Sequence, residues 1–101
     1  MTRRQLRLDM GYRPDEFDQT LQGFCAARPP LHCSGSPPRW QLTDDRQGLK
    51  ARIDIQSLPE RRIGMLILPR LQVDLDIQSE DARALDAFMQ GFHRHFHKGG
   101  G

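Results

Sequence analysis

The sequence contains no asparagine, few aromatic residues and only two lysines among its fifteen basic residues. Without asparagine, turns must be formed by glycine, proline, aspartate and serine. No apolar run approaches the roughly 18 residues of a membrane-spanning helix, so we expect no transmembrane segment. Fifteen Lys and Arg against thirteen Asp and Glu leave a formal charge of +2. This near-balance gives no reason to expect a polyanion as the main partner.

The length of 101 residues fits one small domain, because two cores of half this size would each be marginally stable. We therefore expect a single domain over residues 1–98 and a flexible glycine tail over residues 99–101. The N-terminus lacks the apolar segment and cleavage site of a secretory signal, so we expect a cytoplasmic protein. In that compartment Cys25 and Cys33 are expected to remain thiols rather than to form a disulfide.

Apolar and polar residues alternate, as they do in strands, along several parts of the chain. These are residues 6–10, 40–43, 49–56 and 71–77, with a further apolar stretch over residues 63–68. Ser57 to Glu60 predict a hairpin connection, and Pro69 predicts a bulge, a bend or an edge position. Residues 31–39 predict a loop that begins with a short extended piece.

Two segments have the spacing of amphipathic helices. The first begins near Pro14 and aligns Phe17, Leu21, Phe24 and Cys25 on one side. The second has Ser79 as its expected N-cap and Lys98 near its end. Its apolar stripe consists of Leu85, Phe88, Met89, Phe92 and Phe96. The order predicts an α+β two-layer sandwich, β-α-β-β-β(-β)-α: a mainly antiparallel sheet of four or five strands with both helices on one face.

The sheet face opposite the helices is the main candidate for function. It carries Lys50, Arg52, Asp54, Gln56, Gln72, Asp74 and Asp76 at alternating positions. Leu66 and Leu68 fall on the same face, so mixed charge surrounds a small apolar centre. Such a surface suits a symmetric dimer or the docking of a protein partner. The alternative is a solvated sheet face on which two exposed leucines are tolerated.

Our leading hypothesis is therefore a non-enzymatic binding or accessory module that acts through this open sheet face, as a homodimer or with another protein. The expected interface residues are Leu66, Leu68, Arg52 and Asp74. The sequence has no Gly-rich phosphate loop and no paired-carboxylate arrangement, so it predicts no substrate or reaction.

A metal site is the alternative from another class. On a helix, His93 and His97 lie on the same side, at the spacing that lets two imidazoles bind one ion such as zinc. A third ligand would come from His32 or Cys33. Otherwise the histidines flank the apolar stripe of the last helix without binding metal. No other cofactor is expected.

Nucleic-acid binding is a further hypothesis, based on two groups of basic residues. These are Arg3, Arg4, Arg7 and Arg13, and Lys50, Arg52, Arg61, Arg62 and Arg70. Cross-strand pairing with aspartates would neutralise such a surface. The order of elements over residues 14–97 is similar to that of double-stranded-RNA-binding domains, but Ser79, Glu80 and Asp81 stand where that family has a Lys-rich helix start. We therefore do not expect nucleic acid as the main partner.

Overall fold

The computed structural model describes residues 1–96, whose elements follow the order β-α-β-β-β-β-α. The strands are β1 (Thr2–Met10), β2 (His32–Ser36), β3 (Arg39–Asp44), β4 (Leu49–Ile63) and β5 (Leu66–Ser79). The helices are α1 (Pro14–Ala26) and α2 (Ala82–His95). The predicted α+β class is confirmed. The expected glycine tail at residues 99–101 lies outside the described residues, as does Lys98.

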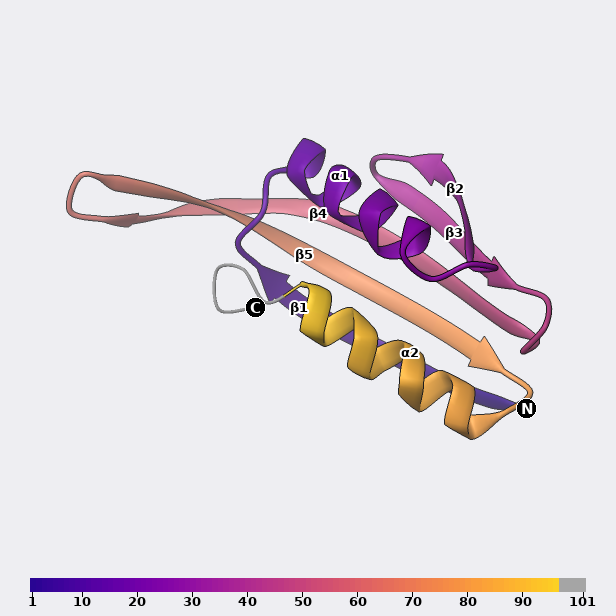
Figure 1. Ribbon diagram of the computed structural model, residues 1–101. Coiled ribbons are helices and arrows are strands. Elements are labelled where there is room, and N and C mark those ends of the chain that lie inside the picture. The colour runs from indigo at the N-terminus through magenta and orange to yellow at the C-terminus, as the bar shows by residue number, and fades with distance from the viewer. Residues whose placement is uncertain (97–101) are drawn as a thin grey trace.

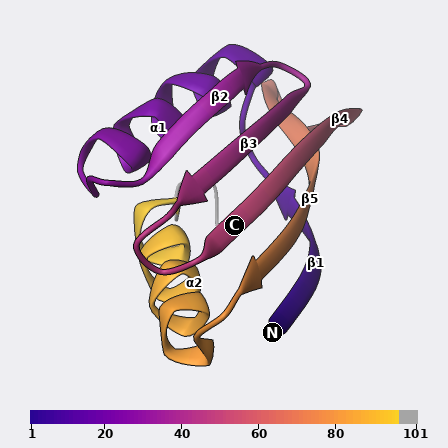
Figure 2. The same cartoon turned by 90° about the vertical axis from the view of Figure 1, so that its right-hand side faces the viewer.

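The five strands form one antiparallel sheet in the order β1-β5-β4-β3-β2. Both helices cover the same face of this sheet (Figures 1 and 2). The first strand lies beside the last, from Thr2 opposite Ser79 to Met10 opposite Leu71. Four strands separate the helices. Residues 32–36, predicted as mostly loop, form the edge strand β2 because they pair with β3.

An aromatic cluster holds the helices on the sheet. Phe17 and Phe24 of α1 and Phe92 of α2 are fully buried, and so is Phe96 just after α2. The Phe92 and Phe96 rings stack with their centroids 4.3 Å apart, and Phe24 contacts Phe92 edge to face. Trp40 of β3 extends the cluster, with its ring 5.3 Å from that of Phe17. The predicted apolar stripes of both helices therefore form the core.

The predicted hairpin connection at residues 57–60 is wrong. β4 continues through these residues to Ile63, and the chain turns at Gly64 and Met65 instead. Gly64 has a φ of 61°, in the left-handed region that favours glycine. The two residues Pro59 and Glu60 stand opposite the single residue Pro69 as a bulge, which accommodates proline within a ladder. The prediction for Pro69 is thereby confirmed, and residues 66–79 form one strand.

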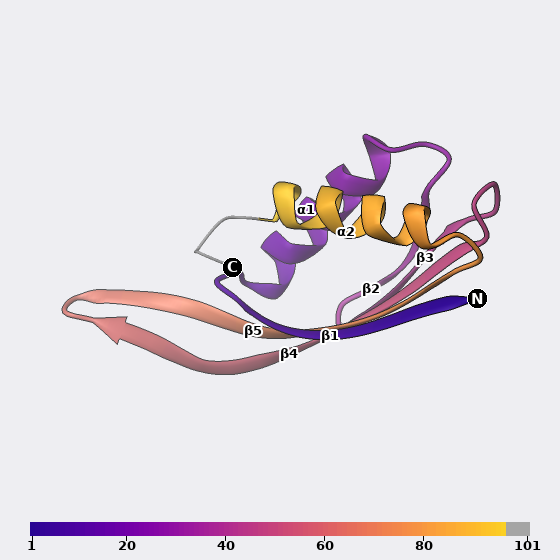
Figure 3. The ribbon, with the colours of Figure 1, turned by 90° about the horizontal axis from the view of Figure 1, so that it is seen from below.

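The end of the β4–β5 hairpin projects beyond the rest of the molecule (Figures 1 and 3). We call residues 58–70 the arm. Neither β3 nor β1 reaches it, because β3 pairs with β4 only as far as Asp54, and β1 pairs with β5 only as far as Leu71. Residues 61–68 are all exposed.

The start of α2 also differs from the prediction. Its N-cap is Asp81, whose carboxylate accepts a hydrogen bond from the backbone N–H of Arg83 at 2.9 Å. Ser79 is instead fully buried at the end of β5, where its hydroxyl donates to the carbonyl of Gln47 and accepts from the N–H of Asp81. The helix ends at His95, earlier than the predicted end near Lys98.

We predict that Phe92→Ala strongly destabilises the fold. The substitution removes a fully buried ring that packs against Phe24 and Phe96, and such changes cost about 3–5 kcal/mol. Urea denaturation followed by circular dichroism measures the free energy of unfolding. Met65→Ala is the matched control, since Met65 is fully exposed and its loss should change stability by less than about 0.5 kcal/mol. Equal effects of the two substitutions would contradict the described core.

Candidate functional site

The arm carries the main exposed apolar surface of the described residues. Within residues 1–96, the large hydrophobic side chains that are exposed are Met1 and five members of the arm. These five are Ile63, Met65, Leu66, Ile67 and Leu68, which we call the apolar tip; their exposed fractions range from 39% to 101%. A contiguous apolar group of this kind marks an interaction site more often than a tolerated surface.

The apolar tip presents hydrophobic side chains on both faces of the hairpin. Successive residues of a strand point to opposite faces, and in β5 the odd-numbered residues from Leu71 to Ile77 are buried beneath the helices. Leu66 and Leu68 therefore point to the open face of the sheet, away from the helices, while Ile67 points to the helix side. Ile63 is opposite Leu66 and shares its face.

Two arginines stand at the base of the apolar tip, one on each face. Arg61 is opposite Leu68 and Arg62 is opposite Ile67 in the register of β4 and β5. Arg70, further down, is held by Asp9 at 2.5 Å and by the backbone carbonyl of Pro59 at 3.4 Å. The arm contains three arginines and one acidic residue, Glu60, at its base. The base of the arm therefore has a net positive charge, and its tip is uncharged.

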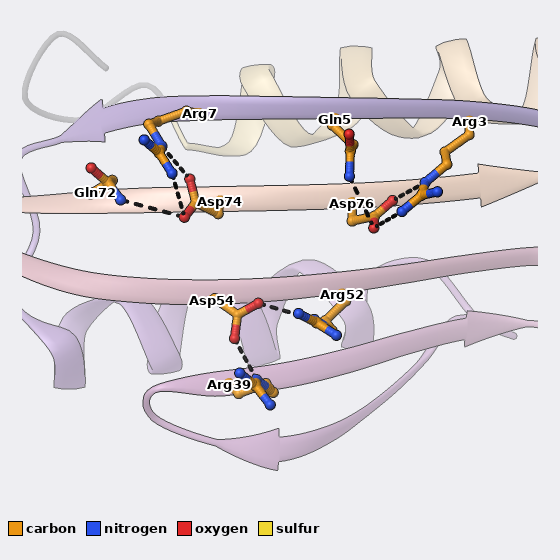
Figure 4. Close-up of polar contacts among 9 residues, drawn as sticks. All are labelled: Arg3, Gln5, Arg7, Arg39, Arg52, Asp54, Gln72, Asp74 and Asp76. Carbon is orange, nitrogen blue, oxygen red and sulfur yellow. Dashed lines mark hydrogen bonds and ion pairs between the residues drawn. The ribbon is translucent and has the colours of Figure 1, made fainter.

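The rest of the open face is covered with ion pairs between neighbouring strands (Figure 4). Arg3 of β1 binds Asp76 of β5 through two contacts of 2.9 and 2.7 Å. Arg7 binds Asp74 in the same way at 2.8 and 3.5 Å. The predicted cross-strand neutralisation is thus present. It leaves little unpaired charge in the centre of the face for a polyanion.

A second cluster of charges lies where β3 meets β4. Asp54 accepts hydrogen bonds from Arg39 and, at 3.1 Å, from Arg52. Partial burial alone would raise the pKa of Asp54, but the hydrogen bonds from the two arginines outweigh it and lower the pKa. Asp54 therefore stays ionised down to acidic pH. Arg52, one of the predicted interface residues, is engaged within its own chain.

Two further aspartates have pKa values that arginines lower. The hydrogen bond from Arg3 lowers the pKa of the Asp76 carboxyl, and the hydrogen bond from Arg70 lowers that of Asp9. A carboxylate with a lowered pKa is a poor general acid at neutral pH. These groups stabilise the sheet and do not resemble a catalytic pair.

Three shallow depressions lie on the surface of the described residues. Two depressions of about 400 and 500 Å³ lie on the open face and meet around Arg52 and Asp76. A third, of about 330 Å³, lies between α2 and the segment after α1, and is lined by Arg28, Asp44 and Phe88. Arg28 is stacked on the ring of Phe24 and Asp44 binds Gln47. The polar groups of this third depression are therefore already engaged within the chain.

The histidines are not brought together in the described residues. His93 is exposed on α2, His32 is exposed at the start of β2, and His97 lies outside the described residues. His95 packs against the ring of Phe24 and its Nε2 lies 3.1 Å from the carbonyl oxygen of Thr20. Within residues 1–96, no group of three or more metal-ligating side chains occurs. The described residues therefore give no support to the metal-site hypothesis.

The two cysteines lie where the end of α1 packs against β2. Cys25 is buried, and this burial raises the pKa of its thiol to about 12, with a further contribution from Cys33. Burial also raises the pKa of Cys33, which accepts a hydrogen bond from Gln22. Neither thiol has the lowered pKa of a nucleophilic cysteine.

The predicted interface residues fall into two separate groups. Leu66 and Leu68 belong to the apolar tip, whereas Arg52 and Asp74 lie within the ion-paired part of the sheet. Leu68 and Asp74 are six positions apart along β5, which corresponds to about 20 Å. The prediction did not include Ile63, Met65 or Ile67. Their signal in the sequence is an apolar run between Arg62 and Pro69 that contains a turn glycine.

A scan against protein-family models gives no match, and a search of the curated proteins finds no relative of this chain. In the described part of the chain, neither helix has the length and apolar character needed to cross a membrane. The apolar tip and the ion-paired open face are therefore the features from which a function is proposed.

We predict that the ion pairs of the open face make stability depend on pH in the acid range. Because the folded pKa of Asp76 is lowered, its contribution is complete above the unfolded value of about 3.9 and is lost as the pH falls through the folded value. Between about pH 6 and about pH 2.5, the free energy of unfolding should therefore fall less in Asp76→Asn than in the wild type, as measured by urea denaturation. Gln90→Asn, at an exposed position of α2, is the control. An unchanged acid dependence in Asp76→Asn would contradict the Arg3–Asp76 pair.

We also predict that Cys25 is unreactive in the folded protein. With its pKa raised to about 12, almost none of its thiol is ionised at pH values near 8, and only the thiolate is alkylated. Iodoacetamide labelling followed by mass spectrometry should leave Cys25 unmodified until urea unfolds the chain. Labelling of Cys25 in buffer at its rate in urea would show that the thiol is not enclosed.

Proposed function

We propose that this protein is a small non-enzymatic docking module that binds a protein, either a second copy of itself or another chain, through its open face and arm. The observation that carries the proposal is the concentration of exposed large hydrophobic side chains on the arm. Isolated two-stranded hairpins are at best marginally stable in water. A partner that covers the apolar tip would therefore stabilise both the arm and the complex.

In this proposal Leu66 and Leu68 are the apolar anchor of the interface. They lie on the open face, where a partner approaching from the side opposite the helices meets them first. Arg52 and Asp74 form the polar rim, because each is exposed or partly exposed and already ion-paired. An apolar centre with a polar rim is the usual anatomy of a protein interface, and the centre supplies most of the binding energy.

The remaining groups support a binding role over catalysis. The thiols have raised pKa values, and Asp9, Asp54 and Asp76 are held ionised by arginines. An activated nucleophile or a general acid needs shifts in the opposite direction. We propose that the module works in the cytoplasm, where its two thiols remain reduced.

Site-specific photo-crosslinking in the source cell tests this proposal. A benzophenone side chain is placed at Met65, which is fully exposed in the apolar tip, or at Gln90, which is exposed on α2. We expect protein adducts from position 65 and not from position 90. Leu66→Asp combined with Leu68→Asp should remove at least nine tenths of these adducts, because each buried carboxylate carries a desolvation cost.

The matched control is Gln19→Asp combined with Gln90→Asp, which adds the same charge at two exposed positions on the helices, away from the arm and the open face. Circular dichroism should show that both double variants remain folded, since all four positions are exposed. The control variant should keep its adducts. Absence of adducts from position 65, or equal adducts from positions 65 and 90, would remove the proposal.

A further inference from the structure

The arm has an unpaired strand edge on the side where β1 ends. β1 covers β5 as far as Leu71 and then leaves the sheet at Gly11. Within residues 1–96, the five residues from Leu66 to Arg70 therefore have β4 on one side and no strand on the other (Figure 1). An uncovered strand edge of this kind is a template for pairing with another chain.

The peptide groups of Ile67 point out of the hairpin at this edge. Ile63 and Leu66 flank the two-residue turn and are partners in the ladder, so they form the mutually hydrogen-bonded pair that closes such a turn. In an antiparallel ladder the next pair, Arg62 and Ile67, directs its N–H and C=O groups outwards. Ile67 thus offers both a donor and an acceptor to a neighbouring strand.

The sequence around Ile67 is self-complementary for antiparallel pairing. Leu66, Ile67 and Leu68 read the same in both directions. If a second copy pairs about a two-fold axis at Ile67, the two Ile67 residues face each other and each Leu66 faces a Leu68. All three positions then place apolar side chains against apolar side chains. Across the axis, leucines on the open face contact leucines, and Ile67 on the helix side contacts the Ile67 of the second copy.

We propose that two copies of this chain associate through the β5 edges of their arms, in an antiparallel ladder centred on Ile67. This inference rests on the proposed docking function and names its partner as a second copy. The two arms then form a four-stranded ribbon in the order β4-β5-β5-β4, with an isologous contact of the kind that closes at a dimer.

The charges of the arm are compatible with this arrangement. Arg61 and Arg62 belong to β4, the outer strand of the ribbon on each side. Three strand spacings, or about 14 Å, separate the two β4 strands, which exceeds the Debye length of about 8 Å at physiological salt. Arg70 lies beside the ladder but is neutralised by Asp9 of its own chain.

The free backbone edge also favours a protein strand over a lipid surface. Lipid would cover the apolar side chains, but it would leave the outward N–H and C=O groups of Ile67 without partners. A second strand satisfies them. Pro69 has no N–H and limits the ladder to the few residues around Ile67. Since stable interfaces use about 20–30 residues a side, we expect a weak dimer that forms reversibly as the concentration rises.

Sedimentation velocity from low to high micromolar concentration tests the dimer. We expect the wild type to shift from monomer to dimer, and Ile67→Asp to remain a monomer throughout because it places two carboxylates opposite each other. The matched control is Ile63→Asp, since Ile63 and Ile67 are similarly exposed, at 56% and 52%. Ile63 lies on the outer strand, so this variant should dimerise within about threefold of the wild type. Dimerisation of Ile67→Asp, or equal loss in both variants, would overturn the ladder.

A short bis-maleimide locates the axis. In the ladder the two residues at position 67 have Cα atoms about 5.5 Å apart, so Ile67→Cys should give a covalent dimer within minutes. Ile63→Cys should crosslink at least tenfold less, at the level set by the native cysteines in the wild type. Equal crosslinking of the two variants would place the axis elsewhere and overturn the proposal.

The outcomes also separate this inference from the proposed function. A wild type that remains monomeric at high concentration, while position 65 gives adducts with another protein in cells, overturns self-association and leaves the docking function standing. A dimer that depends on Ile67, together with adducts joining two copies of the chain, supports both. Monomeric protein and no adducts from position 65 would overturn both.

Discussion

The packing of two helices on one face of the sheet is the constraint on which the rest of the structure depends. Phe24, Phe92 and Phe96 form the centre of this contact, and their rings are within 4.3 to 6.2 Å of one another. Because the helices bury one face, the alternation of each strand fixes which of its residues are exposed to solvent, since a register slip of one residue would expose the core. The ion pairs of the open face follow from this arrangement.

Alternation was sufficient to predict much of the fold. The segments ending at Met10 and beginning at Leu49 have clear period-two patterns, and the stripes containing Phe17 and Phe92 have clear helical spacing. These signals are local, so a single sequence contains them. The cross-strand neutralisation of Asp74 and Asp76 was also foreseen, because strand neighbours of opposite charge were available on the same face.

The errors concern features that depend on distant parts of the chain. Pro59 indicated a break, but a bulge opposite Pro69 lets β4 continue to the turn at Gly64. No local pattern shows that β1 stops at Leu71 and leaves the arm uncovered, because this depends on which strand lies beside which. The proposed role of Ile67 in pairing follows only from that edge. The N-cap of α2 is Asp81 rather than Ser79, because the hydroxyl of Ser79 donates to the carbonyl of Gln47 in the core.

The bulge at the base of the arm separates two parts of the chain with different demands on their sequence. The parts of β4 before Leu58 and of β5 after Arg70 belong to the sheet beneath the helices, and substitutions of their buried residues change the stability of the whole domain. Residues 61–68 are exposed and contribute little to that core. Substitutions in the arm should therefore cost little in folding, so that, under the proposed docking function, the same scaffold would acquire new binding specificities through a few changes around one turn.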